Sequence, residues 1–333
     1  MSAAFRLMTT ACLLLLALPA WAGGLFVSSA DTDSIIRFDA NTGALIGTFV
    51  TAGSGGLDNP GGLAFGPNGN LFVNSRATGN VLEFNGGTGA FVGTFVAAGS
   101  GGLAQPLDLA FGPDGNLYVA NFTGVPDNIL RFNGATGAFI DVFATEATFN
   151  TPRHIEFAAG VLWAAGEADR IWRFDAVTGA FLNKPQSDNP RGLVLGADGL
   201  MYVSSSTSGV FRRDALTGAS VDQFVFPPPS LGDNDIAFGP DGQLYASGGD
   251  RVRRFDAVTG AFIDDFVAAG SGGLSTGRYF LFAANAAIPE PGTWSLLGLA
   301  LLALSFATTR GSRAVRVRRP GAPSGTDRTS ANR

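Results

Sequence analysis

Apolar and polar positions alternate in short runs along most of the chain, and glycine-rich turns separate the runs. Leu71-Phe72-Val73 and Val81-Leu82-Glu83-Phe84 are two examples, each long enough for one short β-strand. The pattern lacks the 3.6-residue period that a solenoid of helices would show. The sequence therefore predicts an all-β protein made of many short strands.

Two turn phrases recur through this pattern. A turn phrase, Asp or Asn followed three residues later by Thr-Gly, occurs six times at intervals of 39 to 48 residues, and its glycines are Gly43, Gly89, Gly137, Gly179, Gly218 and Gly260. The phrase Phe-Gly-Pro-Asn/Asp-Gly spans 65–69, 111–115 and 238–242, with a weaker copy at 196–199. Proline presets φ, Asp or Asn bonds the nearby backbone and glycine accepts a positive φ, so both phrases predict hairpin turns. Repeats of about forty residues with several short strands are typical of propeller blades.

One repeat predicts four antiparallel strands, over 62–65, 71–73, 81–84 and 90–96. The counts differ at the two ends of the repeat region. Leu25-Phe26-Val27 is a second strand with no inner strand before it, and Tyr279-Phe280-Leu281-Phe282 is an inner strand with nothing after it. We expect the two ends to pair in one shared blade, which closes a six-bladed β-propeller and removes exposed strand edges. An open solenoid is the alternative.

The phrase at 109–119, Leu-Ala-Phe-Gly-Pro-Asp-Gly-Asn-Leu-Tyr-Val, resembles the repeats of NHL-repeat and gluconolactonase-like six-bladed propellers, and also virginiamycin B lyase. The resemblance covers roughly 25–282. Turn and strand residues carry it, so it implies a fold more than an activity.

If the Pro-Asp-Gly turns lie on one face of the ring, the loops at the opposite face converge on the central channel, where a site would lie. The blade pattern places six residues where the inner strands begin: Gly62, Asp108, His154, Gly192, Asp235 and Tyr279. It places six more where the second strands end: Ser29, Asn74, Asn121, Glu167, Ser204 and Gly248. Asn, Asp, His and Glu oxygens and nitrogens suit a hard cation such as calcium. The alternative is a set of polar residues in a water-filled channel.

Gluconolactonase-like enzymes hold a divalent metal in this channel, and the resemblance implies calcium or magnesium ligands at Asp108, Asn121, Glu167 and Asp235. The resemblance to the lyase implies a histidine and glutamate pair with magnesium, for which His154 and Glu167 are the candidates on adjacent strands of one blade. His154, the only histidine, is a candidate general base or a hydrogen-bonded loop residue. Gly-x-Ser-x-Gly, His-Glu-x-x-His and phosphate-cradling glycine loops are absent.

Two further features have structural interpretations. The segment Ala-Gly-Ser-Gly-Gly-Leu occurs at 52–57, 98–103 and 269–274, each time between an outer strand and the next inner strand. This position predicts a crossover between blades rather than a nucleotide-binding loop. Trp163 and Trp172 stand where other repeats have apolar strand residues, which predicts core positions.

The composition agrees with a packed domain: 46% of the 333 residues are hydrophobic and 15% are charged. The net charge of −5 disfavours nucleic acid as a partner, because phosphate backbones require a basic surface. Residues 1–22 predict a secretory signal peptide, with Arg6 before an apolar run and Ala20-Trp21-Ala22 as the cleavage site. Cys12, the only cysteine, would leave with it, so disulfides are not expected.

The C-terminal region begins with Pro289-Glu290-Pro291, continues with the apolar run 294–309 and ends in arginines through Arg319. A transmembrane helix over 294–309 would measure about 24 Å, short for a bilayer core of about 30 Å, and the arginines predict that it ends inside. The segment 288–319 resembles the PEP-CTERM sorting signal. That resemblance implies processing by an exosortase-type enzyme and delivery to the cell surface or an exopolysaccharide matrix. The polar tail 320–333 departs from the family pattern, and a plain membrane anchor is the alternative.

We therefore expect a signal peptide at 1–22, a propeller at 23–287 and a sorting segment at 288–319. The protein would be exported across the inner membrane to the cell envelope or extracellular matrix and transiently anchored by its C-terminal helix. The expected function is a non-enzymatic binding module for an extracellular protein or polysaccharide. A metal-dependent lactonase or lyase that uses the central channel is the alternative.

Overall fold

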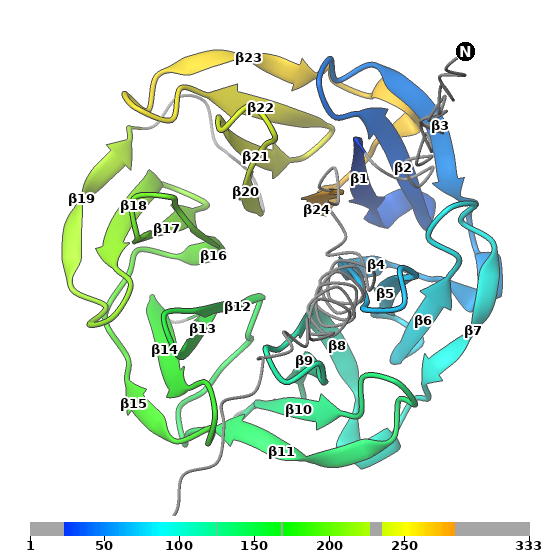
Figure 1. Ribbon diagram of the computed structural model, residues 1–333, viewed down its shortest axis with the longest axis horizontal. Coiled ribbons are helices and arrows are strands. Elements are labelled where there is room, and N and C mark those ends of the chain that lie inside the picture. Colours follow the sequence, from blue (N-terminus) through cyan, green and yellow to red (C-terminus); the bar gives the residue numbers. More distant parts are fainter. Residues whose placement is uncertain (1–22, 125, 168, 227–234, 284–333) are drawn as a thin grey trace, which may run out of the picture. The chain divides into compact units, whose positions relative to one another are not determined.

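A computed structural model describes residues 23–124, 126–167, 169–226 and 235–283, which form six four-stranded antiparallel sheets around a central channel (Figure 1). Each sheet is one blade of a β-propeller. The first strand of every blade lies nearest the channel and the fourth lies at the rim (Figure 1). The all-β, six-bladed fold predicted from the repeat is confirmed.

The strands follow the predicted blade order. Blade 1 comprises β24 (Gly277–Phe282), β1 (Gly24–Ser29), β2 (Ser34–Asp39) and β3 (Leu45–Val50); blade 2 comprises β4 (Pro60–Phe65), β5 (Leu71–Ser75), β6 (Asn80–Phe84) and β7 (Phe91–Val96). Blade 3 comprises β8 (Gln105–Phe111), β9 (Leu117–Phe122), β10 (Asn128–Phe132) and β11 (Phe139–Thr145); blade 4 comprises β12 (His154–Ala158), β13 (Val161–Gly166), β14 (Arg170–Asp175) and β15 (Phe181–Asn183). Blade 5 comprises β16 (Pro190–Leu195), β17 (Leu200–Ser205), β18 (Gly209–Asp214) and β19 (Ser220–Val225); blade 6 comprises β20 (Ile236–Phe238), β21 (Leu244–Gly248), β22 (Arg251–Phe255) and β23 (Phe262–Val267).

Blade 1 is built from both ends of the repeat region. Strand β24 pairs antiparallel with β1, and Phe282 lies opposite Leu25 while Phe280 lies opposite Val27. The pairing closes the ring, as counting the strands predicted, because β24 covers the edge of β1 that would otherwise be unpaired. Figure 1 shows the two strands side by side, with β2 and β3 continuing outward.

The Thr-Gly turns follow the expected hairpin chemistry. Asp39 Oδ1 accepts hydrogen bonds from the backbone N–H of Asn41 and Thr42 and from Thr42 Oγ1, at 2.9 to 3.0 Å. Gly43 has a φ of +70°, and a Cβ there would lie 1.9 Å from the carbonyl oxygen of Phe266 in the next blade. The glycine is therefore required both by the turn and by the close approach of two blades. The same acceptor role falls to Asn85, Asn133, Asp175, Asp214 and Asp256 in the other copies.

Interdigitating rings fill the space between blades. Tyr118 of blade 3 packs edge-on against Phe143 of its own blade and Phe157 of blade 4, each at a centroid distance of 4.8 Å. Trp163 and Trp172 are fully buried, so their predicted core role is confirmed. Burying a large apolar side chain contributes about 1.5–3 kcal/mol, and pairs that cross a blade boundary hold the ring together.

Short 3-10 turns connect blades where the glycine-rich segments predicted crossovers. They are η2 (Ser54–Gly56), η3 (Ser100–Gly102) and η4 (Ser271–Gly273), while η1 (Ala30–Thr32) joins β1 to β2. Over the residues that the structure describes, no helix is long and apolar enough to cross a membrane. The predicted signal peptide 1–22, sorting segment 288–319 with its helix 294–309, and tail 320–333 lie outside the described residues.

Candidate functional site: the charged channel

The inner strands bring four polar side chains, Asp108, His154, Asp235 and Tyr279, together at one level of the channel, which we call the waist. Asp108 lies in β8, His154 begins β12, Asp235 directly precedes β20 and Tyr279 lies in β24. All four occupy the same blade position, so the symmetry of the ring directs them toward one another. The two aspartates are buried, at 4% and 6% exposed.

His154 stands between the two carboxylates. Its Nδ1 lies 3.1 Å from Asp235 Oδ1 and 3.8 Å from Asp108 Oδ2. Each carboxylate also binds the backbone of the following blade: Asp108 accepts from the N–H of Ile155 at 2.8 Å, and Asp235 accepts from the N–H of Phe280 at 3.1 Å. The aspartates thus join blade 3 to blade 4 and blade 6 to blade 1.

The charges at the waist compensate one another. Burial by itself lowers the pKa of His154, but the carboxylates of Asp108 and Asp235 outweigh it and raise that pKa to about 9. Burial raises the pKa of Asp108 to about 6. At neutral pH the imidazole is therefore protonated and pairs with carboxylates on both sides. A protonated imidazole has no lone pair with which to accept a proton, so this geometry does not suit a general base.

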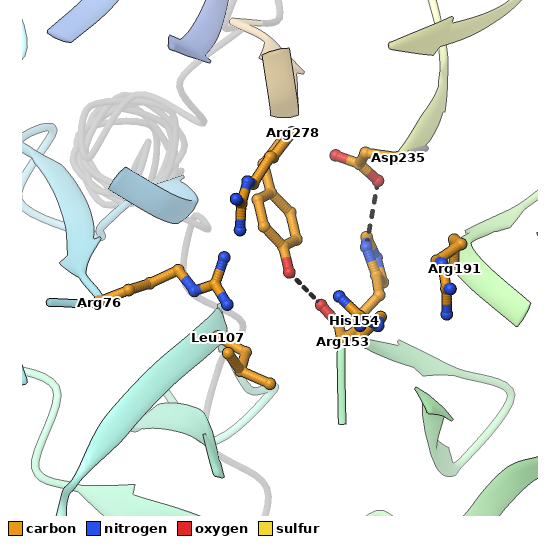
Figure 2. Close-up of a pocket in the computed structure, with 8 residues that line it drawn as sticks. Arg76, Leu107, Arg153, His154, Arg191, Asp235 and Arg278 are labelled. Carbon is orange, nitrogen blue, oxygen red and sulfur yellow. Dashed lines mark hydrogen bonds and ion pairs between the residues drawn. The ribbon is translucent and has the colours of Figure 1, made fainter. Parts of the chain in front are cut away.

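Four arginines surround the end of the channel where the inner strands begin (Figure 2). We call this set, Arg76, Arg153, Arg191 and Arg278, the arginine mouth. It borders a small space that is partly open to solvent. His154, Asp235 and Tyr279 also line this space.

Three of these arginines share one blade position, immediately before the channel residues His154, Gly192 and Tyr279. Arg76 enters from a different strand, directly after β5. Blade 2 has Gly61 at the shared position, and a Cβ there would lie 3.0 Å from Arg76 Cδ. The glycine therefore leaves the room in which the stem of Arg76 lies.

The arginines differ in their protein partners. Arg153 forms an ion pair with Glu167, and its backbone carbonyl accepts a hydrogen bond from the Tyr279 hydroxyl. The buried Nε atoms of Arg76 and Arg278 have no hydrogen-bond partner among the described residues. Burial raises the pKa of Tyr279 well above its usual value, so its hydroxyl remains a donor. The mouth thus collects positive charge that the nearby protein only partly compensates.

The structure separates the candidate metal ligands predicted from the sequence. Asp108 and Asp235 both lie beside His154, whose imidazole stands between their carboxylates. Asn121 uses its amide within blade 3, accepting from the N–H of Ala104 and donating to Gly102 and Asn128. In the described part of the chain no three His, Cys, Asp or Glu side chains form a group suited to a metal ion. A divalent cation at these residues stays a prediction.

The candidate catalytic pair is also divided. Glu167 directly follows β13 and pairs with Arg153 rather than with His154. The arginine mouth was not predicted, because the candidate positions were the first channel residue of each inner strand and the end of each second strand, and the four arginines lie just outside both sets. The signal was the arginine that precedes the first channel residue in three of the six repeats, at positions 153, 191 and 278.

The fold and the channel define a six-bladed β-propeller with a charged centre. Residues 85–197, about a third of the chain, match a family described as a repeat of unknown function (DUF6923). No curated protein matches the chain. The crystal structure of a functionally unknown protein from Desulfotomaculum acetoxidans DSM 771 is similar, with a TM-score of 0.52 and 15% identity over 76% of this chain and 98% of that chain. The computationally designed Ika8 protein is 17% identical, with a TM-score of 0.46 over 75% of this chain and 72% of its own. The Desulfotomaculum structure supports the fold alone, and membership of the NHL-repeat or gluconolactonase-like families stays a prediction.

Proposed function

We propose that this protein is a non-enzymatic binding module of the cell envelope or extracellular matrix, which holds a carboxylate group of an acidic polysaccharide at the arginine mouth. The observation that carries the proposal is the convergence of four guanidinium groups on one end of the channel of a protein with a net charge of −5. Positive charge is concentrated there against the overall balance of the chain.

The chemistry of the arginines favours a carboxylate. A guanidinium is planar, always charged and matches a carboxylate with two parallel hydrogen bonds. Arg76 and Arg278 each have a buried Nε without a protein partner among the described residues, and an anionic ligand would supply that partner. The partly enclosed setting strengthens such a pair relative to bulk water.

The waist of the channel supports binding over catalysis. Asp108 and Asp235 bind backbone groups of the neighbouring blades and hold His154 in its charged form. Carboxylates that already accept backbone hydrogen bonds and pair with an imidazolium are poorly placed to bind a metal, and a protonated histidine does not abstract a proton. The predicted lactonase or lyase activity therefore lacks a favourable arrangement at the waist.

The choice of an acidic polysaccharide rests on the predicted route of the protein. The signal peptide predicted at 1–22 and the PEP-CTERM-like segment predicted at 288–319 imply export and delivery to a surface or exopolysaccharide matrix, after processing by an exosortase-type enzyme. Uronic acids are one class of sugar that carries a carboxylate, and they serve here as the probe.

Calorimetric titration with a glucuronic acid oligosaccharide tests the proposal. Wild-type protein should bind it with an affinity that falls as salt rises, because screening weakens charge pairs. The double variant Arg76→Gln/Arg278→Gln should bind at least tenfold more weakly. Arg212→Gln is the matched control, since Arg212 pairs with Asp222 and Asp198 near a turn on the opposite face.

Three results would contradict this proposal. The oligosaccharide would fail to bind saturably, the double variant would bind like the control, or a neutral glucose oligosaccharide would bind equally well. A polyglutamate peptide provides a further arm. Tighter binding of that peptide would retain the arginine mouth as the site and overturn the polysaccharide as its ligand.

A further inference from the structure

A second compartment lies on the other side of the waist, between His154 and the face that carries the Pro-Asp-Gly turns. The inner strands β4, β8, β12 and β24 line it, and it includes about 1110 Å³ of space that no protein atom fills and that is partly open to solvent. We call this compartment the lower chamber. Its walls are largely apolar, and Phe65, Phe111, Leu281 and Phe282 contribute to them.

Glu156 interrupts this apolar lining. It lies two residues after His154 on β12, at the blade position that holds Ala64, Ala110, Val194, Ala237 and Leu281 in the other five blades. Glu156 is thus the only charged residue among six equivalent positions. The alanines of blades 2 and 3 leave room within the chamber beside it.

The Glu156 side chain is half-buried in the wall of the chamber. Within the described part of the chain no residue donates a hydrogen bond to Glu156, and its electrostatic neighbours are His154, which favours its ionised form, and Asp108 and Asp235, which oppose it. Burial raises the pKa of Glu156 to about 7. His154 is already paired with the two aspartates. Glu156 therefore lacks both a donor and a counter-charge of its own.

We propose that the lower chamber binds a small organic cation, a protonated primary amine with an apolar body. An ammonium group supplies three donors and the missing positive charge to Glu156. The apolar walls, to which Phe65 and Phe111 contribute, cover the alkyl part of the ligand. A calcium ion suits the chamber less well, because it requires six to eight oxygen ligands and Glu156 offers one carboxylate.

This inference is independent of the proposed function. The two compartments lie on opposite sides of the His154 layer, and their ligands have opposite charge. Variants at the arginine mouth should therefore leave amine binding unchanged, and variants at Glu156 should leave binding of the uronic acid oligosaccharide unchanged. The failure of either proposal can be told apart from the failure of the other.

The test is a titration of the full-length protein with n-butylamine at pH 8, followed by calorimetry. Wild-type protein should bind the amine saturably, and Glu156→Gln should weaken the affinity at least tenfold. This variant resembles the protonated acid in shape, so it should fold, which a thermal melt verifies. Glu83→Gln is the matched control, because Glu83 lies on β6 and accepts hydrogen bonds from Asn68 and Asn70 outside the chamber.

The pH dependence gives a second readout. Ionised Glu156 is required, so lowering the pH from 8 to 6 should weaken amine binding about tenfold for a group with a pKa of about 7. Carbon-13 NMR of the Glu156 carboxyl should show its pKa falling when the amine is present. Equal affinity for wild type and Glu156→Gln, no saturable binding by the folded wild type, or an unchanged pKa with saturating amine would each overturn the inference.

Discussion

Replacing His154 with glutamine tests the charge balance at the waist of the channel. The imidazolium is the positive partner of two buried carboxylates, Asp108 and Asp235. Glutamine retains hydrogen-bonding capacity and removes the charge, so both carboxylates stay buried without compensation. Removing one partner of a buried ion pair costs about 3–5 kcal/mol.

The pH dependence gives a second, independent value for the stabilisation that His154 contributes. The pKa of His154 is raised from 6.5 to about 9, and each unit corresponds to about 1.4 kcal/mol. While both aspartates are ionised, a raised folded-state pKa means that the stabilisation is fully present at pH 6.5 and is lost as the pH rises through about 9. The wild-type free energy of unfolding should therefore fall by roughly 3 kcal/mol over this interval.

Urea denaturation of wild type and His154→Gln at pH 5.5, 7.5 and 9.5 measures both effects. At pH 7.5 the variant should be less stable by about 3 kcal/mol. The difference should shrink at pH 5.5, where Asp108, with a pKa of about 6, becomes protonated, and at pH 9.5, where the wild-type imidazole loses its charge. His154 is the only histidine, but Glu156, with a pKa of about 7, also titrates between pH 6.5 and 9, so the contribution of the imidazole is the difference between the wild-type and His154→Gln slopes. Two results together would refute this charge balance: a difference in the free energy of unfolding below about 1 kcal/mol at pH 7.5, and the same dependence of that free energy on pH in wild type and His154→Gln.

Three further predictions concern the blades. Gly89→Ala should lower the free energy of unfolding, measured in urea, by roughly 1–3 kcal/mol. Gly89 has a φ of +72°, and a Cβ there would lie 1.8 Å from Phe49 O. Gly93→Ala, whose Cβ would meet no atom within 4 Å, is the control, and equal stability of the two variants would contradict the turn argument. Asp141→Asn should lower the free energy of unfolding by at most about 1 kcal/mol, because the Arg131–Asp141 ion pair at 2.5 Å is solvent-accessible, with Asp141 43% exposed. A coupling energy above about 2 kcal/mol in a double-mutant cycle would contradict this expectation. Truncation before Gly277 removes β24 and exposes the edge of β1, so it should abolish cooperative unfolding and produce oligomers in size-exclusion chromatography with light scattering, whereas a monomer with wild-type cooperativity would show that ring closure is dispensable.

The fold was predictable because its determinants are local and repeated. Asp39 and Gly43 specify a hairpin from within five residues, and six copies of that signal reveal the blades. The closure by β24 followed from counting strand types at the two ends. The convergence of Asp108 and His154 followed from their equal blade positions, since symmetry places such residues at one level of the channel.

The details of the site depend on contacts that no repeat specifies. Asp108 binds the backbone N–H of Ile155, 47 residues away, and this depends on how two blades pack. Arg76 reaches the mouth from β5 because Gly61 leaves space for it, a relation between two strands that a single blade position does not show. Asn121 was predicted as a metal ligand because the sequence does not show its hydrogen-bond partners. One of them, Gly102, belongs to the crossover before β8, and only the folded structure brings it to Asn121.

The central claim is that the arginine mouth binds an anionic group. A crystal structure of the protein with 4-bromobenzoate, a carboxylate that bromine makes visible by anomalous scattering, tests it most directly. We predict a bromine peak in the channel with the carboxylate paired to Arg76 and Arg278, and no peak in crystals of the Arg76→Gln/Arg278→Gln variant. A peak that persists in that variant, or bromobenzoate bound only elsewhere on the propeller, would contradict the claim.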